Sequence, residues 1–162
     1  MKSIIIALTV GGITKNAILK TNADSAKTQN LTIMQVERPA GVAVTAFPFR
    51  AGTQCNISEI LELLALNAAK GLLTITSVKF EDMGSSVSLT LPVIKKVQVS
   101  VTNEGATLKI DGVTQPGLSW VGYLHKGESV TYTAELEGYT TQTDTLTVNT
   151  SDITEEITLV EE

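Results

Sequence analysis

The only histidine of the chain, His125, limits the acid–base and nucleophilic chemistry that the sequence permits. A Ser-His-Asp or Cys-His site would have to use His125, with partners from elsewhere in the fold. Tyr123, Lys126 and Gly127 beside it are typical of a loop at a strand end, and no motif links it to a serine or to the only cysteine, Cys55. An isolated cysteine is more often a small buried apolar residue than a nucleophile. We therefore expect no enzymatic activity.

Acidic residues, the candidates for hydrolytic catalysis and metal binding, occur in adjacent pairs and in turns. The pairs are Glu81-Asp82, Glu155-Glu156 and Glu161-Glu162, and the turn aspartates are Asp111, Asp144 and Asp152. Neighbours in a strand point to opposite faces, whereas a glycosidase needs two acids that face one cleft. Oxygen ligands from loops would suit Ca²⁺, but no EF-hand or Asp-rich repeat is present. The sequence therefore predicts no metal and no cofactor.

A glycine pair and three lysines form the next candidate site. Gly11-Gly12 follows an apolar run as a phosphate loop would, but it lacks the G-x-G-x-x-G and GK[ST] patterns and predicts a turn. Lys15, Lys20 and Lys27 make the following segment basic. Interleaved aromatics are missing and the isoelectric point is about 4.9, which argues against nucleic-acid binding. A sharper interpretation is docking onto an acidic protein surface.

Aromatic residues suggest a second kind of binding site. Trp120 and Tyr123 have opposite parities in one predicted strand, so one side chain is expected in the core and the other outside. We assign Trp120 to the core. An exposed Tyr123 beside Tyr132 or Tyr139 would form a platform for a sugar ring, but simple packing is the preferred interpretation of these tyrosines.

The composition predicts a mainly β protein. The chain has 162 residues with 23 threonines and only 4% aromatics, and β-branched residues favour pleated strands. Charge is divided unequally: residues 1–95 hold 9 Lys and Arg against 6 Asp and Glu, and residues 96–162 hold 3 against 11. The apolar run at residues 4–10 ends after seven residues without a convincing cleavage site, so it predicts a buried strand. No run is long enough to span a bilayer, and we expect no membrane association.

The first half is predicted to be an α+β domain with one amphipathic helix at residues 57–70. Asn56 and Glu59 fit a capping box, and Gly71 can end the helix in the left-handed conformation. The face expected in the core comprises Ile57, Ile60, Leu61, Leu64, Ala65 and Ala68. Leu66 falls on the opposite side, where it is either an ordinary exposed leucine or a contact with a neighbouring subunit. Strands are predicted at residues 3–10, 30–37, 42–47, 72–81 and 86–91.

A domain boundary is predicted between residues 95 and 96, because a strand ends near Pro92 and a clean alternation restarts at Val97. Asp111-Gly112 is a strong type I′ hairpin signal. Short strands are expected at residues 97–102, 106–110, 118–124, 129–135, 140–148 and 156–160. This spacing is typical of an immunoglobulin-like (Ig-like) β-sandwich.

The second half resembles the PEGA-type domain, an immunoglobulin-like or transthyretin-like module of bacterial surface proteins and bacteriophage structural proteins. The residues that carry the likeness are those at 99–102 and 105–112, Lys126-Gly127 before the strand at 129–134, and Glu137-Gly138-Tyr139. The match as a whole spans about 40% of the chain. The resemblance implies a β-sandwich and says little about function.

The helix of the first half resembles capsid-anchoring domains of phage head-fibre and auxiliary capsid proteins, and the whole chain is most similar to auxiliary capsid proteins of crAss-like tailed phages. This resemblance implies a non-enzymatic decoration protein on the outer capsid surface, bound to the major capsid protein. Other head proteins and host-surface glycans are further candidate partners. The candidate shell contacts are Lys15, Lys20, Lys27, Arg38, Arg50 and Leu66.

The alternative is a secreted adhesion or carbohydrate-binding module of a bacterial cell surface. Its candidate glycan contacts are Tyr123, Tyr132 and Tyr139. This alternative requires that the N-terminal apolar run be cleaved.

Overall fold

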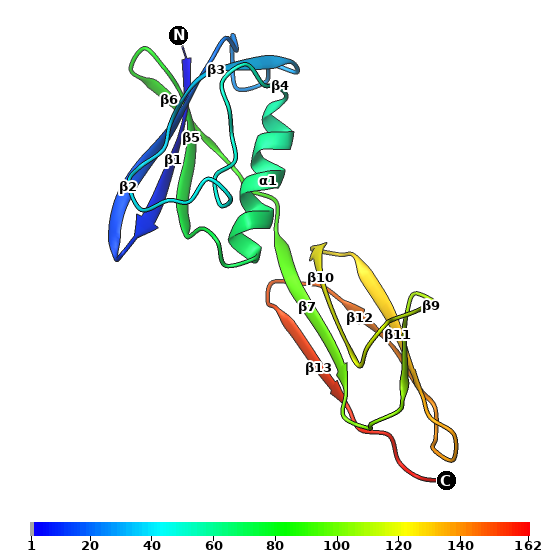
Figure 1. The fold of residues 1–162 in the computed structure, drawn as a ribbon. Coiled ribbons are helices and arrows are strands. Elements are labelled where there is room, and N and C mark those ends of the chain that lie inside the picture. The colour runs from blue at the N-terminus through cyan, green and yellow to red at the C-terminus, as the bar shows by residue number, and fades with distance from the viewer. Residues whose placement is uncertain (1) are drawn as a thin grey trace. The chain divides into compact units, whose positions relative to one another are not determined.

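A computed structural model describes residues 2–162, and it is mainly β with one helix, as the sequence predicts (Figure 1). The described residues form three sheets, and all but one of the strand pairs are antiparallel. Two separate hydrophobic cores are present, one in each half of the chain.

The first half is built on a six-stranded antiparallel sheet with the strand order β4-β3-β2-β1-β5-β6. The strands are β1 Lys2–Val10, β2 Ile13–Thr21, β3 Leu31–Glu37, β4 Gln54–Cys55, β5 Ile75–Asp82 and β6 Ser85–Leu89. The N-terminal apolar run is β1, which pairs with both β2 and β5. Its side chains Ile4, Ile6 and Leu8 are buried, so this run is a central core strand.

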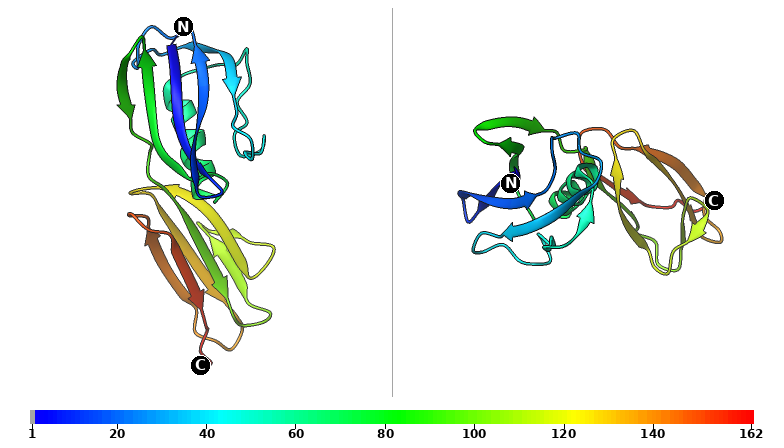
Figure 2. Two further views of the ribbon diagram at one scale, coloured as in Figure 1. Left: turned by 90° about the vertical axis from the view of Figure 1, so that its left-hand side faces the viewer. Right: turned by 90° about the horizontal axis from the view of Figure 1, so that it is seen from above.

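One face of this sheet is covered by the single helix, α1 Ile57–Ala69 (Figure 2). The predicted capping box is confirmed: Asn56 Oδ1 accepts the Glu59 N–H at 2.8 Å, and the Glu59 carboxylate accepts the Asn56 N–H at 3.4 Å. Gly71 has a positive φ of 76°, as expected for the residue that ends the helix. The buried face is Ile57, Ile60, Leu64, Ala65 and Asn67, whereas Leu61 and Ala68 are half-buried.

Strand β2 is not predicted by the sequence. Its inward-facing residues include Ala17 and Leu19, but Lys15 shares their parity and interrupts the apolar alternation. The turn that joins β1 to β2 is the predicted one, since Gly11 and Gly12 have φ values of 58° and 79°, the combination that suits a two-residue hairpin.

The prediction of a strand at residues 42–47 is wrong. The Ala43 carbonyl accepts hydrogen bonds from the backbone N–H groups of Ala46 and Phe47, both at 3.1 Å, so the segment folds into turns. Its apolar residues cover the core from a loop, and the buried Asn67 ties that loop to α1 by donating from Nδ2 to the Ala46 carbonyl at 2.9 Å. An apolar run without strict alternation cannot distinguish such a loop from a strand.

The second half is a β-sandwich of a three-stranded sheet, β10-β7-β13, and a four-stranded sheet, β12-β11-β8-β9. The strands are β7 Ile94–Val101, β8 Thr107–Ile110, β9 Val113–Thr114, β10 Ser119–His125, β11 Ser129–Glu135, β12 Gln142–Thr147 and β13 Ile153–Ile157. Both sheets contribute to one core, with Val97 and Val99 from one sheet facing Leu108 and Val130 from the other. Asp111 and Gly112 have positive φ values, as the predicted hairpin requires.

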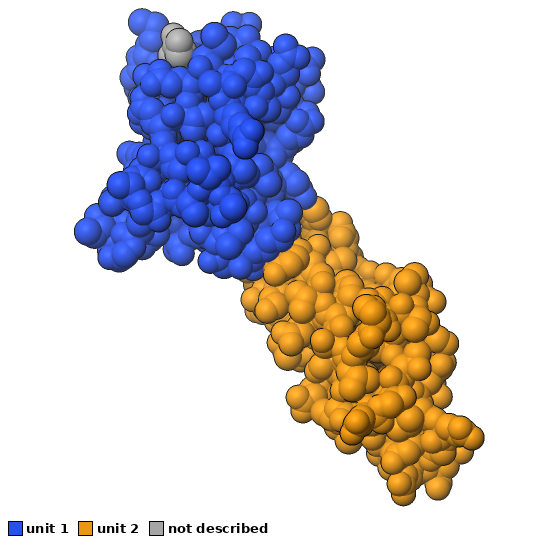
Figure 3. Space-filling view, in the orientation of Figure 1, with its two compact units in different colours: residues 1–92 blue, residues 93–162 orange. Residues whose placement is uncertain are grey.

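The chain divides into two compact units, residues 1–92 and residues 93–162 (Figure 3). The division falls between Pro92 and Val93, whereas the sequence places it between residues 95 and 96. The difference arises because β7 already begins at Ile94, so Lys95 and Lys96 belong to the first strand of the second unit rather than to a linker.

Candidate functional site

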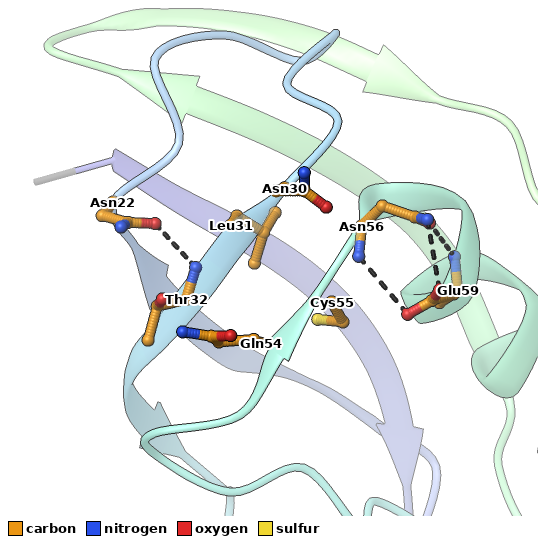
Figure 4. Close-up of a pocket in the computed structure, with 8 residues that line it drawn as sticks. All are labelled: Asn22, Asn30, Leu31, Thr32, Gln54, Cys55, Asn56 and Glu59. Carbon is orange, nitrogen blue, oxygen red and sulfur yellow. Dashed lines mark hydrogen bonds between the residues drawn. The ribbon is translucent and has the colours of Figure 1, made fainter.

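A polar pocket of about 550 Å³ lies beside β3, β4 and the start of α1 in the first unit (Figure 4). Amide side chains dominate its lining, together with one carboxylate and one thiol. The lining residues are Asn22, Asn30, Leu31, Thr32, Gln54, Cys55, Asn56 and Glu59. Amides both donate and accept hydrogen bonds, so this lining suits neutral polar groups such as amides and hydroxyls.

Two internal hydrogen-bond systems hold the walls of the pocket. Asn22 Oδ1 accepts the backbone N–H of Thr32 at 2.6 Å, which fixes the loop after β2 against β3. Asn56 Nδ2 donates to the Glu59 carboxylate at 3.2 Å within the capping box. The carboxylate is therefore already engaged by the helix start, and among residues 2–162 no cluster of acidic, histidine and cysteine side chains is suited to a metal ion.

Cys55 lies in this pocket as a half-buried residue without a disulfide. Burial raises the pKa of the Cys55 thiol above its ordinary value, and the negative charge of Glu59 raises it further. Both effects disfavour the thiolate, which is the reactive form of cysteine. The environment of Cys55 is thus the opposite of that around an activated nucleophile.

The pKa of Cys55 provides a test of this electrostatic environment. The variant Glu59→Gln should lower the pKa of the thiol and speed alkylation by iodoacetamide near pH 8, because one nearby negative charge is removed. The pKa should stay above its ordinary value, since burial is the larger cause. Glutamine at this position can preserve the capping box, so the helix start is retained. The measurement is the alkylation rate as a function of pH.

Glu62→Gln is the matched control, because it removes the same charge from the same helix and Glu62 does not contribute to the raised pKa of Cys55. It should leave the alkylation profile in place. Equal profiles for Glu59→Gln and the unmodified chain would show that Glu59 exerts no field on the thiol.

His125 belongs to the second unit, at the end of β10, whereas Cys55 belongs to the first. Its Nδ1 lies 3.1 Å from Oε1 of Glu128 across the turn to β11, and 40% of its side chain is exposed. This geometry is that of a local surface pair in a turn. The pair places Glu128 beside the only histidine of the chain, within a turn of the second unit.

The three candidate lysines are placed in different surroundings. Lys15 Nζ donates to the Ala40 carbonyl at 3.2 Å, and Lys20 forms an ion pair with Glu37 at 3.2 Å. Lys27 is exposed in the loop between β2 and β3. Lys15 and Lys20 have opposite parities in β2 and therefore point to opposite faces of the sheet. Docking of this segment onto an acidic protein surface remains a prediction.

Arg38 has an internal role that the sequence does not reveal. Its Nη2 and Nε donate to the Phe47 carbonyl at 2.8 and 3.2 Å, and Nη2 reaches the Phe49 carbonyl at 3.5 Å. The guanidinium also lies 6.0 Å from the centre of the Phe47 ring. Arg38 therefore fixes the loop after β3 over the core, whereas Arg50 is exposed.

Leu66 is half-buried and lines an apolar hollow of about 440 Å³ on α1. Leu63 is the other apolar residue of this hollow, and we call the pair the α1 patch. Its polar rim consists of Asn56, Ser58, Glu59 and Glu62. A leucine pair framed by polar side chains on the outer side of a helix is a candidate contact surface.

The predicted tyrosine platform is wrong for Tyr132, which is only 4% exposed and packs in the core of the sandwich. Tyr132 is inward because it alternates with Thr131 and Thr133 on β11. Tyr123 lies on β10 in the other sheet, with the parity opposite to that of Trp120. Tyr139 packs partly against the core, and its hydroxyl donates to Glu161 at 3.0 Å.

Trp120 is half-buried rather than fully enclosed, and its ring packs against the core of the sandwich. A Cβ atom at Gly122 would lie 2.3 Å from this ring, so the glycine makes room for the indole. Trp120 faces the core, as expected. It lies on β10, an edge strand, and its side chain remains partly exposed.

The aspartates considered for calcium each accept a backbone hydrogen bond. Asp111 Oδ1 accepts from Thr131 N at 2.8 Å, and Asp152 Oδ1 accepts from Lys96 N at 3.0 Å. Asp144 Oδ1 accepts from the next backbone N–H at 2.7 Å. These bonds agree with the interpretation of the aspartates as structural residues.

Sequence reasoning missed the polar pocket because its amide side chains come from separate segments of the chain, and β4, which carries Gln54, is too short to show an alternating pattern. No helix among residues 2–162 is long and apolar enough to cross a bilayer.

No protein-family model, curated protein or solved structure matches the chain. The residues of the chain itself therefore carry the functional interpretation.

Proposed function

We propose that the protein is a non-enzymatic component of a phage virion, which attaches to the major capsid protein through its first unit and displays its second unit on the outer capsid surface. The observation that carries the proposal is the division of charge between two units with separate cores. Residues 1–92 hold 8 Lys and Arg against 6 Asp and Glu, and residues 93–162 hold 4 against 11.

This division suits a protein with one attached part and one displayed part. A strongly acidic surface repels its own copies and stays solvated, which favours the second unit on the solvent side of a crowded shell. The first unit is near neutral, so electrostatic repulsion of this kind does not oppose its close contact with the shell. The resemblance of the second unit to PEGA-type modules, which occur in phage structural proteins and in bacterial surface proteins, is compatible with this assignment and does not by itself favour it.

The α1 patch is the surface that we assign to the shell contact. Leu66 and Leu63 provide apolar area that association can remove from water, and the surrounding polar rim can set the orientation. Lys27 and Arg50 remain candidate contacts because both are exposed. Arg38 and Lys15 are not part of this proposal, since both side chains bond to backbone carbonyls of their own unit.

Co-sedimentation with shells assembled from the major capsid protein tests the proposal. The full chain should bind, and Leu66→Glu should weaken binding at least about tenfold, because a charge would replace apolar contact area. Val121→Glu is the matched control, since Val121 is an exposed apolar residue on the second unit. It should bind like the unmodified chain.

Removal of residues 93–162 separates attachment from display. The remaining unit retains its complete core, and circular dichroism can verify that it is folded. It should still sediment with the shells. A folded first unit that fails to bind, or a Leu66→Glu variant that binds with unchanged affinity, would contradict the assigned attachment surface.

A further inference from the structure

We propose that β6 is a self-association edge, along which two copies of this chain pair antiparallel and join their six-stranded sheets. The proposal is independent of the capsid assignment. It starts from the position of β6 at the end of the strand order, where it pairs with β5 on one side only. An edge strand presents backbone N–H and C=O groups that can pair with another chain.

The two edges of this sheet differ in how they are protected. At one edge β4 has only two residues, which limits pairing with another strand. At the other edge β6 has five residues, Ser85–Leu89, without a charged residue or a proline. In an antiparallel pair of identical strands, the residue on the two-fold axis faces its own copy, and a like charge at or near that position would oppose pairing. The neutral sequence of β6 is therefore compatible with pairing to itself.

The hairpin geometry defines which residues would pair. Asp82 and Ser85 flank a two-residue turn, and Met83 and Gly84 in that turn have positive φ values of 45° and 89°. Residues flanking such a turn form a hydrogen-bonded pair, and pairing then alternates along the strands. The backbone groups of Ser86 and Ser88 consequently point away from β5.

A two-fold axis beside Val87 would give the outward-pointing backbone groups of Ser86 and Ser88 hydrogen-bond partners on the second copy. Ser86 of one copy would exchange backbone hydrogen bonds with Ser88 of the second copy, and the reverse pair would do the same. Val87 would then oppose Val87 of the second copy in a non-hydrogen-bonded pair, where side chains approach most closely. Val87 is 53% exposed in the described structure, so this contact would cover apolar surface.

Met83 supplies a second observation at the same edge. Its side chain is 98% exposed, and its positive φ is a conformation that a methionine adopts at an energetic cost. Extended beyond the ends of β6, the register centred on Val87 would bring Met83 toward Leu91 of the second copy, which packs partly against its own core. An exposed apolar residue at the tip of a hairpin thus obtains an apolar neighbour in the paired state.

The interface is small, so the expected association is weak. Pairing of two five-residue strands buries less than the roughly 1,200 Å² of a stable interface, which suggests a dissociation constant on the order of 0.1 mM. Crowding of many copies on one surface would raise their effective concentration and favour pairing.

Sedimentation equilibrium of the full chain tests the proposal. The mass should rise from 17.2 kDa toward twice that value as concentration increases to about 1 mM. Val87→Lys and Val87→Glu should each remain monomeric, because the substituted residue would face its own copy. An equimolar mixture of the two variants should form a mixed dimer, since opposite charges then face each other.

Val113→Lys is the matched control, because Val113 is an exposed valine on β9 of the second unit, and it should associate like the unmodified chain. Hydrogen exchange should show concentration-dependent protection at Ser86 and Ser88. A chain that stays at 17.2 kDa up to about 1 mM, or a dimer that Val87→Lys leaves intact, would overturn the proposal.

Discussion

Phe47→Ala should destabilise the first unit by about 3–5 kcal/mol, the range found when a buried phenylalanine is truncated. Phe47 is completely buried, and its ring meets that of Phe49 edge-on with 4.7 Å between ring centres. A unit of this size is typically stable by only about 5–14 kcal/mol, so the loss is a large part of the total. Because each unit has its own core, we expect the loss to be confined to the first unit.

Two residues of the chain report on the two units separately. Trp120 is the only tryptophan and lies in the second unit, and Cys55 is the only cysteine and lies in the first. In urea, Phe47→Ala should shift the onset of rapid Cys55 alkylation to lower concentration and leave the Trp120 fluorescence transition in place. Val130→Ala, in the core of the sandwich, should do the reverse. A common shift of both signals would show that the units unfold as one.

The fold could be predicted from the sequence where neighbouring residues alone determine the local structure. The capping box at Asn56 and Glu59 and the Asp111-Gly112 turn depend on neighbouring residues, and both are formed as expected. Strand β2 was missed because Lys15 occupies an inward position and bonds to the Ala40 carbonyl, which no local pattern reveals. The loop at residues 42–47 was mistaken for a strand because apolar residues cover a core equally well from either conformation.

The candidate contact residues could be predicted less well, because a residue type does not specify its partner. A lysine in the sequence suggests a surface charge that is available to a partner, but Lys20 on β2 already forms an ion pair with Glu37 on the neighbouring strand β3. Tyr132 is amphipathic as a residue type, and its position on β11, where it alternates with Thr131 and Thr133, places it in the core. Leu66 differs from these residues, since helical periodicity alone separates it from the buried face and the structure finds it in the α1 patch.

Arg38→Met should cost the first unit about 2–3 kcal/mol, because hydrogen bonds from a charged donor are typically worth about 1.5–3 kcal/mol. Methionine can replace the aliphatic stem but leaves the Phe47 carbonyl without the two N–H donors that reach it at 2.8 and 3.2 Å. Arg38→Lys should cost less, since an ammonium keeps the charge but cannot reproduce the fork of the guanidinium. Urea unfolding followed by Cys55 alkylation measures both effects.

The same two variants decide between the structural role of Arg38 and its earlier interpretation as a shell contact. If Arg38 fixes the loop that carries Phe47 and Phe49, stability falls in the order unmodified chain, Arg38→Lys, Arg38→Met, and shell binding by the folded protein stays unchanged. If Arg38 instead contacts an acidic shell surface, Arg38→Met weakens binding in a salt-dependent way while stability is retained. Arg50→Met is the control for stability alone, because Arg50 is exposed and should not affect stability, while it remains a candidate shell contact. If Arg38→Met lost shell binding but kept its stability, Arg38 would be a shell contact. Other contacts would then have to hold the loop after β3.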